Sequence, residues 1–161
     1  MDAFFASIEE RDNTRFKGLP IVVGADPEGG RGRGVVSTAN YKAREYGIRS
    51  ALPISKAWEY SEKAKYEGKP PTIFLGVNMK RYVEVSQRIM EIVEQYSKEF
   101  EQASVDEMYF DLSECGNFEE AKKVCEKLKK EIKDKEHLSC SIGLGPNKFI
   151  AKIASDFKKP D

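Results

Sequence analysis

The sequence of 161 residues predicts a mixed α+β fold, and three features of the chain support this class. Apolar residues recur every three or four positions in long charged segments, as at 79–97, which is the spacing of an amphipathic helix. Short apolar runs at 19–25 and 72–77, each close to glycine or proline, have the length and composition of strands. The chain is long enough for one domain or two small lobes.

The first part of the chain is predicted to alternate helices and strands. Phe4, Phe5 and Ile8 give the opening segment the apolar face of a helix. The next predicted elements are a strand at 19–25, a glycine-rich loop at 26–34, a strand at 35–39, a short helix at 40–47 and a helix from Pro53 to about Glu62. Gly47 suits the end of a helix, and Pro53 suits a first turn.

From the loop at 65–71 onward, the predicted order is β-α-β-β-α-β-α. The elements are a strand at 72–77, a helix at 79–97, two strands that meet at Asp106–Glu107, a helix at 117–136 capped by Asn117, a strand at 138–145 and a helix at 147–159. This order predicts a ferredoxin-like sheet with helices on one face. The segment 4–69 would then be a smaller lobe inserted near the start of that fold.

Charge and cysteine content exclude several classes of site. The 27 basic and 27 acidic residues cancel, so net charge does not identify a partner, although 31–49 is locally basic. Three cysteines without a CxxC spacing favour reduced thiols, and the single His137 argues against a zinc site or a histidine-based triad. No apolar run approaches the roughly 20 residues of a membrane span, so we expect a cytoplasmic protein without a membrane partner.

Two adjacent carboxylates, Asp106 and Glu107, stand inside the apolar stretch ASVDEMYFD at 103–111. Neighbours in a regular strand point to opposite faces, so the two can act on one centre only at a turn or bulge, such as a hairpin corner. Two carboxylates this close ionise together only beside a cation, and Mg²⁺ prefers oxygen ligands. The pair therefore suggests metal-assisted phosphoryl chemistry, and a solvated polar turn is the alternative.

Four segments, in order, resemble the signatures of the Y-family (translesion) DNA polymerases. They are MDAFFASIEE at the start, VVSTANYKAREYGIRSALPISKAW at 35–58, SVDEMYFDLS at 104–113 and SCSIGLGPNKFIAKIASDFKKPD at 139–161. The resemblance covers nearly the whole chain. It implies template-directed DNA synthesis past damaged bases, with a deoxynucleoside triphosphate (dNTP) and primer-template DNA as partners.

The resemblance implies a palm from 1–3 and 70–161, lacking its first strand, and a small α/β fingers insertion at 4–69. In the palm, Asp106 and Glu107 would be catalytic and would bind two Mg²⁺ ions, for which Mn²⁺ could substitute. Lys159 matches a palm lysine that reaches the triphosphate of the nucleotide.

In the fingers, the matching residues would bind the incoming nucleotide. Phe5 matches the steric gate that excludes a 2′ hydroxyl. Thr38, Tyr41 and Arg44 match residues that contact the triphosphate, and their hydroxyl, phenol and guanidinium can all donate to phosphate oxygens.

The sequence departs from the family pattern at both ends. The family has an apolar strand ending in a third metal-binding Asp, and here Met1 takes the next position, whose carbonyl commonly touches a metal. The resemblance implies thumb and little-finger domains after Pro160–Asp161, through which a sliding clamp would be recruited, and we expect this sequence to lack them. We therefore expect a catalytic fragment with weak activity or none.

Two alternatives use the same elements. A nucleotidyl or diguanylate cyclase has a similar sheet and metal-bound acids, but SVDEMYF lacks the glycines of its hairpin motif. A non-catalytic ferredoxin-like nucleic-acid-binding module would present aromatic residues on its middle strands, where Tyr109 offers little. Such a module would not need Mg²⁺ to hold a nucleotide.

Overall fold

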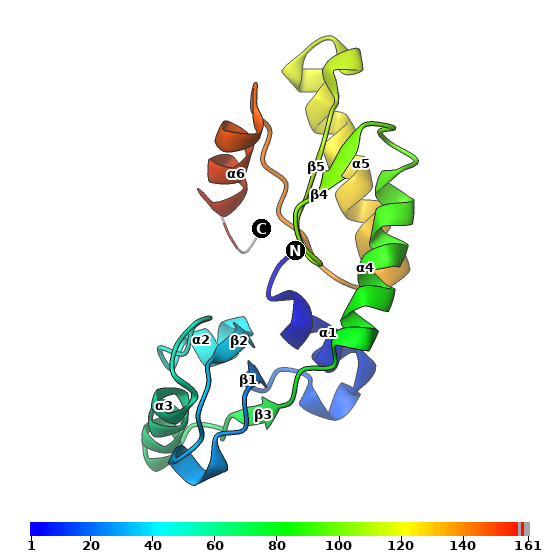
Figure 1. Cartoon of the computed structure of the whole chain (residues 1–161). Coiled ribbons are helices and arrows are strands. Elements are labelled where there is room, and N and C mark those ends of the chain that lie inside the picture. The colour runs from blue at the N-terminus through cyan, green and yellow to red at the C-terminus, as the bar shows by residue number, and fades with distance from the viewer. Residues whose placement is uncertain (158, 160–161) are drawn as a thin grey trace. The chain divides into compact units, whose positions relative to one another are not determined.

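A computed structural model of the chain describes residues 1–157 and 159 and contains two compact units (Figure 1). The N-terminal unit is Ala3–Met79, and the C-terminal unit is Met1–Asp2 with Lys80–Asp161. Residue 158, which belongs to the expected final helix, and residues 160–161 lie outside the described residues. The assignment of 4–69 as fingers and of 1–3 with 70–161 as palm remains a prediction.

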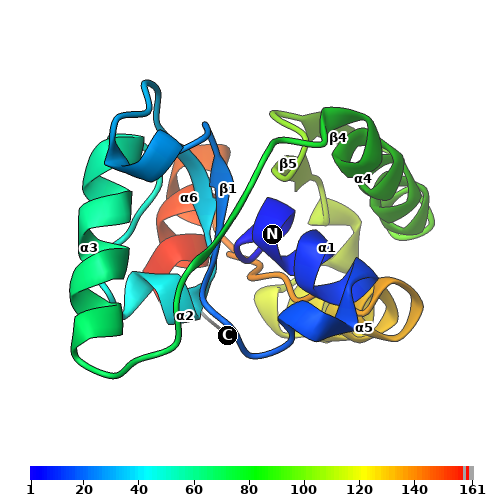
Figure 2. The same cartoon turned by 90° about the horizontal axis from the view of Figure 1, so that it is seen from below.

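The N-terminal unit is built on a three-stranded sheet in the order β2-β1-β3. Its elements are α1 (Phe4–Asp12), η1 (Thr14–Phe16), β1 (Ile21–Gly24), η2 (Glu28–Gly30), β2 (Val36–Ala39), α2 (Tyr41–Arg44), α3 (Ile54–Tyr66) and β3 (Ile73–Leu75). The central strand β1 pairs antiparallel with β2 and parallel with β3. Helices α2 and α3 lie on one face of this sheet and α1 on the other, as Figures 1 and 2 both show.

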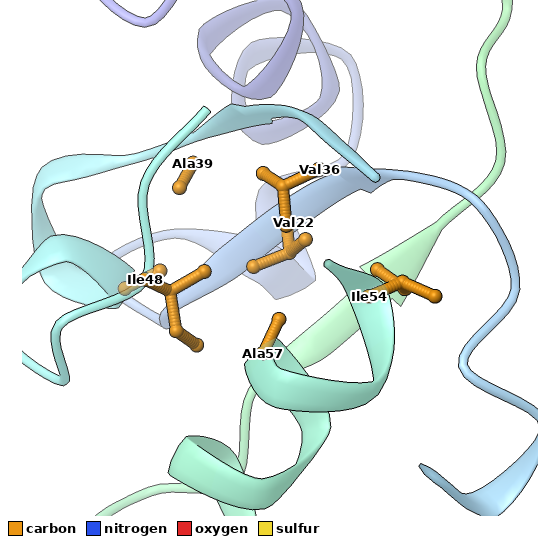
Figure 3. Packing of buried hydrophobic residues seen from close by; sticks show 7 residues of the cluster. Val22, Val36, Ala39, Ile48, Ile54 and Ala57 are labelled. Atoms are coloured by element: carbon orange, nitrogen blue, oxygen red, sulfur yellow. The ribbon is translucent and has the colours of Figure 1, made fainter. Parts of the chain in front are cut away.

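Because helices cover both faces of the sheet, the central strand β1 has apolar residues at consecutive positions. All four of its residues are buried, which a strand of alternating pattern could not achieve. Val22 of β1 packs with residues of β2, α2 and α3 in one buried cluster (Figure 3). The cluster consists of Val22, Val36, Ala39, Ala43, Ile48, Ile54 and Ala57.

The predicted strand at 72–77 exists as β3, but it does not join the second unit as expected. Ile73, Phe74 and Leu75 pair with Ile21, Val22 and Val23 of β1. Phe74 also packs against the buried cluster and lies 5.6 Å, centroid to centroid, from the ring of Trp58. The strand therefore completes the N-terminal sheet, because β1 offers it both an open edge and an apolar neighbour.

The C-terminal unit pairs two long helices with a short hairpin. Its elements are α4 (Met79–Val93), β4 (Phe100–Gln102), β5 (Met108–Phe110), η3 (Ser113–Cys115), α5 (Phe118–Glu136) and α6 (Lys148–Phe157). Asn117 caps α5 as predicted, since its Oδ1 accepts a hydrogen bond from the Glu120 amide at 2.9 Å. Among the described residues, no helix is both long enough and apolar enough to span a membrane.

The predicted strand at 138–145 has no ladder partner among the described residues. This unit therefore contains a two-stranded sheet, β4-β5, and the ferredoxin-like β-α-β-β-α-β order is not observed in the part of the chain that the structure describes. The apolar run at 138–145 gives strand propensity, but a strand also needs a neighbour at hydrogen-bonding distance. The broader α+β class is confirmed.

Candidate active site

The hairpin between β4 and β5 places Asp106 and Glu107 in its turn. The amides of Ala103 and Ser104 both donate to the Glu107 carbonyl, at 3.0 and 3.1 Å, and this closes the turn. The Ser104 hydroxyl donates to Asp106 Oδ1 at 2.8 Å and holds that carboxylate. The sequence prediction of a hairpin corner at these two acids is confirmed.

Two lysines of α6 reach the hairpin. Lys152 Nζ forms an ion pair with Glu107 Oε1, and this hydrogen bond raises the pKa of Lys152. Lys148, one turn earlier, donates to Glu101 Oε2 at 2.5 Å and lies 5.7 Å from the centre of the Tyr109 ring. The ammonium of Lys152 thus balances the charge of one of the two candidate metal-binding carboxylates.

The first two residues of the chain lie beside the same hairpin. The Met1 nitrogen donates to the Asp106 carbonyl at 2.9 Å, and the Asp2 amide donates to the Ser139 carbonyl at 3.2 Å. The Ser141 hydroxyl donates to Asp2 Oδ1 at 2.9 Å. Met1 therefore lies at the carboxylate turn through its nitrogen, and a metal-binding role for its carbonyl remains a prediction.

A groove of about 870 Å³ in the C-terminal unit gathers these groups. Its lining includes Met1, Asp106, Glu107, Lys152 and Lys159. Lys159 Nζ lies 2.8 Å from Asp156 Oδ1, and this contact lowers the pKa of Asp156. The groove thus brings together every residue that the sequence assigned to the catalytic or phosphate-binding part of the palm.

The donor set at the turn suits Mg²⁺ only in part. The described residues contain no cluster of three or more His, Cys, Asp or Glu side chains placed to hold a metal. Asp106 and Glu107 supply two carboxylates, and Mg²⁺ commonly takes its remaining ligands from water and from substrate phosphates. The residues therefore fit an ion that arrives with a nucleotide better than one held permanently by the protein.

The candidate phosphate-binding residues of the N-terminal unit lie where β2 meets α2. Thr38 is on β2, opposite Val23 of β1, and Tyr41 begins α2. The guanidinium carbon of Arg44 lies 4.6 Å from the centre of the Tyr41 ring, and Arg44 Nε donates to the Ala39 carbonyl at 3.0 Å. Stacking and this hydrogen bond fix the planar guanidinium in one orientation, which suits bidentate recognition of phosphate.

Asn40 positions this group, and the sequence prediction did not include it. Its Oδ1 accepts hydrogen bonds from the amides of Ile21 and Ala43, at 2.9 and 3.0 Å, and its Nδ2 donates to the Leu19 carbonyl at 2.8 Å. Asn40 therefore caps α2 and ties it to β1. An Asn directly before a short helix is a recognised capping signal, but its bonds to the strand could not be read from the sequence.

Phe5 lies on α1, where it is partly buried and 6.0 Å, centroid to centroid, from the Phe4 ring. Phe4 is the buried member of the pair. The steric-gate role remains a prediction.

Sequence reasoning also missed two residues at the carboxylate turn. Ser104 is two residues before Asp106, a spacing at which a serine side chain commonly bonds within a turn, so the signal was present. Lys152 stands one helical turn after Lys148, but its pairing with Glu107 spans 45 residues and depends on tertiary structure.

Comparison with known proteins gives consistent matches along the chain. The sequence profile described as the impB/mucB/samB family matches residues 1–156. DNA polymerase IV 2 of Methanosarcina mazei is 49% identical over 162 residues, which is 100% of this chain and 42% of that protein. DNA polymerase IV of Streptococcus mutans is 46% identical and is matched over 99% of this chain and 41% of its own length.

Solved structures give the same result. The crystal structure of DinB from Sulfolobus solfataricus is 37% identical, with a TM-score of 0.85, and the match covers 99% of this chain and 44% of that one. An insertion ternary complex of Dbh DNA polymerase is 36% identical, with a TM-score of 0.86 and the same coverage. The chain thus spans less than half the length of these relatives.

Proposed function

On the premise that this chain belongs to the impB/mucB/samB family, the Y-family of DNA polymerases, we propose that it is the catalytic part of a translesion DNA polymerase. The reaction would be attack of a primer 3′ oxygen on the α-phosphate of a dNTP, with release of pyrophosphate. The observation that carries the proposal is the groove in which Asp106, Glu107 and Lys159 meet.

The partners follow from this reaction. They are primer-template DNA, a dNTP and two divalent ions, Mg²⁺ or in its place Mn²⁺. When bound, the ions would lower the pKa of the attacking hydroxyl and neutralise the leaving phosphates. Contact with a sliding clamp through other regions of a longer protein, and a cytoplasmic location, complete the proposal.

Each candidate residue has a role that its chemistry supports. Asp106 and Glu107 would supply oxygen ligands from one turn, and Met1, whose nitrogen donates to the Asp106 carbonyl, would add its own carbonyl. Lys159, which also lines the groove, would neutralise phosphate charge. Lys152 holds the Glu107 carboxylate, and its ammonium would be displaced from that oxygen when an ion binds there.

The N-terminal unit would bind the rest of the nucleotide. Tyr41 and Arg44, stacked on one another, and Thr38 on the adjoining strand offer donors to the triphosphate. The Phe5 ring would exclude a 2′ hydroxyl. Charge neutralisation and positioning of this kind account for most of the rate of phosphoryl transfer.

A chimera tests the proposal, because the relatives are longer than this chain. The 161 residues would replace the matching part of the Methanosarcina mazei DNA polymerase IV 2, and primer extension would be measured with Mg²⁺. The chimera should extend a primer, and Asp106→Asn with Glu107→Gln should reduce the rate by on the order of 10³-fold or more, since removal of one charge-stabilising group already costs about 10²–10³.

Two results would overturn the proposal. One is a folded chimera that does not extend a primer, although the unmodified relative does so in the same assay. The other is a pair of amide variants as active as the unsubstituted chimera. A matched control, Glu120→Gln in the exposed first turn of α5, should leave the rate unchanged.

A further inference from the structure

We propose that Lys152, Asp156 and Lys159 form a charge relay, which makes Lys159 available to phosphate when Glu107 binds a divalent cation. The relay rests on the proposed function, because it concerns the same groove and the same two ligands. It assigns Lys152 and Asp156 as positioning residues, which act on the phosphate through Lys159.

Asp156 lies between two lysines that approach it from both sides in the sequence. Lys152 precedes it by four residues and Lys159 follows it by three, and side chains at these spacings can meet on a helix. Lys152 Nζ lies 3.9 Å from Asp156 Oδ2, and Lys159 Nζ lies 2.8 Å from Asp156 Oδ1. The two ammonium groups therefore approach different oxygens of one carboxylate.

In the structure, the ammonium of Lys152 is paired with the hairpin and not with its own helix. It forms an ion pair with Glu107 Oε1, while Asp156 is the more distant of its two acidic neighbours. A basic residue that precedes an acidic one by four positions is also the less favourable order for a pair within a helix. Asp156 is thus a reserve partner for Lys152.

The charges of the four groups explain how the relay works. Two carboxylates and two ammonium groups make a neutral set while Lys152 stays on Glu107. When Glu107 takes a divalent cation, Lys152 loses this partner and turns to Asp156. Two ammonium groups on one carboxylate repel each other, so Asp156 holds Lys159 less tightly. The three relay residues then present one net positive charge to a phosphate in the groove.

The relay works through side-chain rotation, because the backbone of α6 is held closely by its neighbour. A Cβ on Gly143 would lie 2.0 Å from the Ala151 carbonyl oxygen and 2.3 Å from the Ser155 amide nitrogen. The segment 139–145 therefore packs directly on the backbone of α6, at a distance that only glycine permits. The relay side chains, in contrast, are 24–53% exposed, and ion pairs at such positions exchange partners at little cost.

A static role for the same pairs is the alternative. Lys152 would then only attach α6 to the hairpin, and Asp156 would only fix Lys159. On this alternative, removing the charge of Asp156 leaves phosphate binding unchanged or weakens it. The relay predicts the opposite, because Asp156 withholds Lys159 from phosphate when no cation is present.

The first test measures binding of inorganic triphosphate to the 161-residue chain by isothermal titration, without metal and at constant ionic strength. Asp156→Asn should raise the affinity by about two- to fivefold, which corresponds to one partly exposed ion pair. The matched control is Glu120→Gln on α5, which removes the same charge from another exposed pair of spacing i,i+3, with Lys123. This control should leave the affinity unchanged.

The second test follows nuclear magnetic resonance signals while Mg²⁺ is added without phosphate. In the unsubstituted chain, the Glu107 amide and the Lys159 side chain should shift with one dissociation constant. In Lys152→Met, Mg²⁺ affinity at Glu107 should rise about two- to fivefold, since the competing ammonium is gone, yet Lys159 should no longer respond. Lys152→Arg keeps the charge and should keep the response of Lys159. Loss of a signal in Lys159→Arg assigns it, and circular dichroism checks folding.

Two results would overturn the relay alone. One is triphosphate binding by Asp156→Asn that is no tighter than that of the unsubstituted chain. The other is a Lys159 signal that ignores Mg²⁺ in the unsubstituted chain, or follows it equally in Lys152→Met, while the Glu107 amide responds. If the Glu107 amide does not respond to Mg²⁺, both the relay and the proposed metal site are wrong.

Discussion

The two units differ in how the backbone N–H and C=O groups of their strands find hydrogen-bond partners. In the N-terminal unit, β1 has a strand on each side and helices on both faces, and all of its residues are buried. In the C-terminal unit, β5 has one described neighbour, β4, and its other edge lines a groove. The candidate metal-binding carboxylates therefore lie on a hairpin whose second strand has one described neighbour, which we call the open unit. Tyr41 and Arg44 lie beside a sheet whose central strand is paired on both edges and covered on both faces, which we call the closed unit.

The units also differ in the bonds that connect their elements. Asn40 joins β1 to α2 through three hydrogen bonds to backbone groups. In the C-terminal unit, two side-chain pairs connect α5 to α4 and to the turn after it: Arg88 of α4 with Glu136, and Tyr96 of the turn with Glu131. Four predictions test whether the closed unit depends on its core and the open unit on these pairs.

The largest expected effect is in the buried cluster. Ile48→Ala should lower the free energy of unfolding of the N-terminal unit by about 3–4 kcal/mol, because Ile48 is fully buried and its removal leaves a cavity. Trp58, the single tryptophan of the chain, lies in α3 and reports unfolding of this unit by fluorescence in urea. Ile153→Ala on α6, where Ile153 is 53% exposed, should change stability by about 0.5 kcal/mol or less. Equal losses of stability in Ile48→Ala and Ile153→Ala would contradict the conclusion that the N-terminal unit depends on its buried core.

Two asparagine caps give the second prediction. Asn40→Ala should cost about 2–3 kcal/mol, since it leaves the buried amides of Ile21 and Ala43 without their acceptor. Asn117→Ala removes an exposed cap of α5 and should cost about 1 kcal/mol. Urea unfolding of both variants, followed by circular dichroism and by Trp58 fluorescence, measures the difference. A larger loss in the free energy of unfolding for Asn117→Ala than for Asn40→Ala would contradict the conclusion that Asn40 stabilises the connection between β1 and α2.

The third prediction concerns the helix pair of the C-terminal unit. Arg88 Nε and Nη2 donate to the two carboxylate oxygens of Glu136 at 2.7 and 3.0 Å, and the Glu136 side chain is only 9% exposed. Arg88→Met should cost about 2 kcal/mol, because it removes the bidentate partner of a buried charge. Lys123→Met, which breaks the exposed pair with Glu120, should cost less than about 0.5 kcal/mol in the same urea titration. Similar values for the two would show that the buried pair does not hold the helices.

The smallest effect should depend on pH. The Tyr96 hydroxyl donates to Glu131 Oε2 at 2.5 Å, and this bond raises the pKa of Tyr96 to about 12. Because the pKa is raised on folding, the bond stabilises the protein below about pH 10, the usual tyrosine value, and is lost as pH rises through about 12. Tyr96→Phe should cost about 1 kcal/mol at pH 8.

The difference between Tyr96→Phe and the unsubstituted chain should shrink as pH rises above about 10. Phenolate absorbance of the folded chain, compared with the variant, should place one tyrosine with a midpoint near pH 12. A difference in stability that grows with pH would contradict the assigned direction of the pKa shift.

Much of the local structure could be predicted from the sequence. The apolar spacing of 79–97 and 117–136 marked α4 and α5, and Asn117 marked a cap that forms as expected. The placement of Asp106 and Glu107 at a hairpin turn also followed from the chain, because two acids between apolar strand residues favour a break in the strand. These features depend on residues close together in sequence.

The sequence by itself determined which segments are helical or extended and that two carboxylates stand side by side. Only the tertiary structure decided that 72–77 pairs with β1, that 138–145 lies beside a groove without a ladder, and that Lys152 reaches Glu107. The physical reason is that periodicity and capping act within a few residues, whereas a strand's partner or a lysine's counter-ion is chosen by competition among groups far apart in the chain.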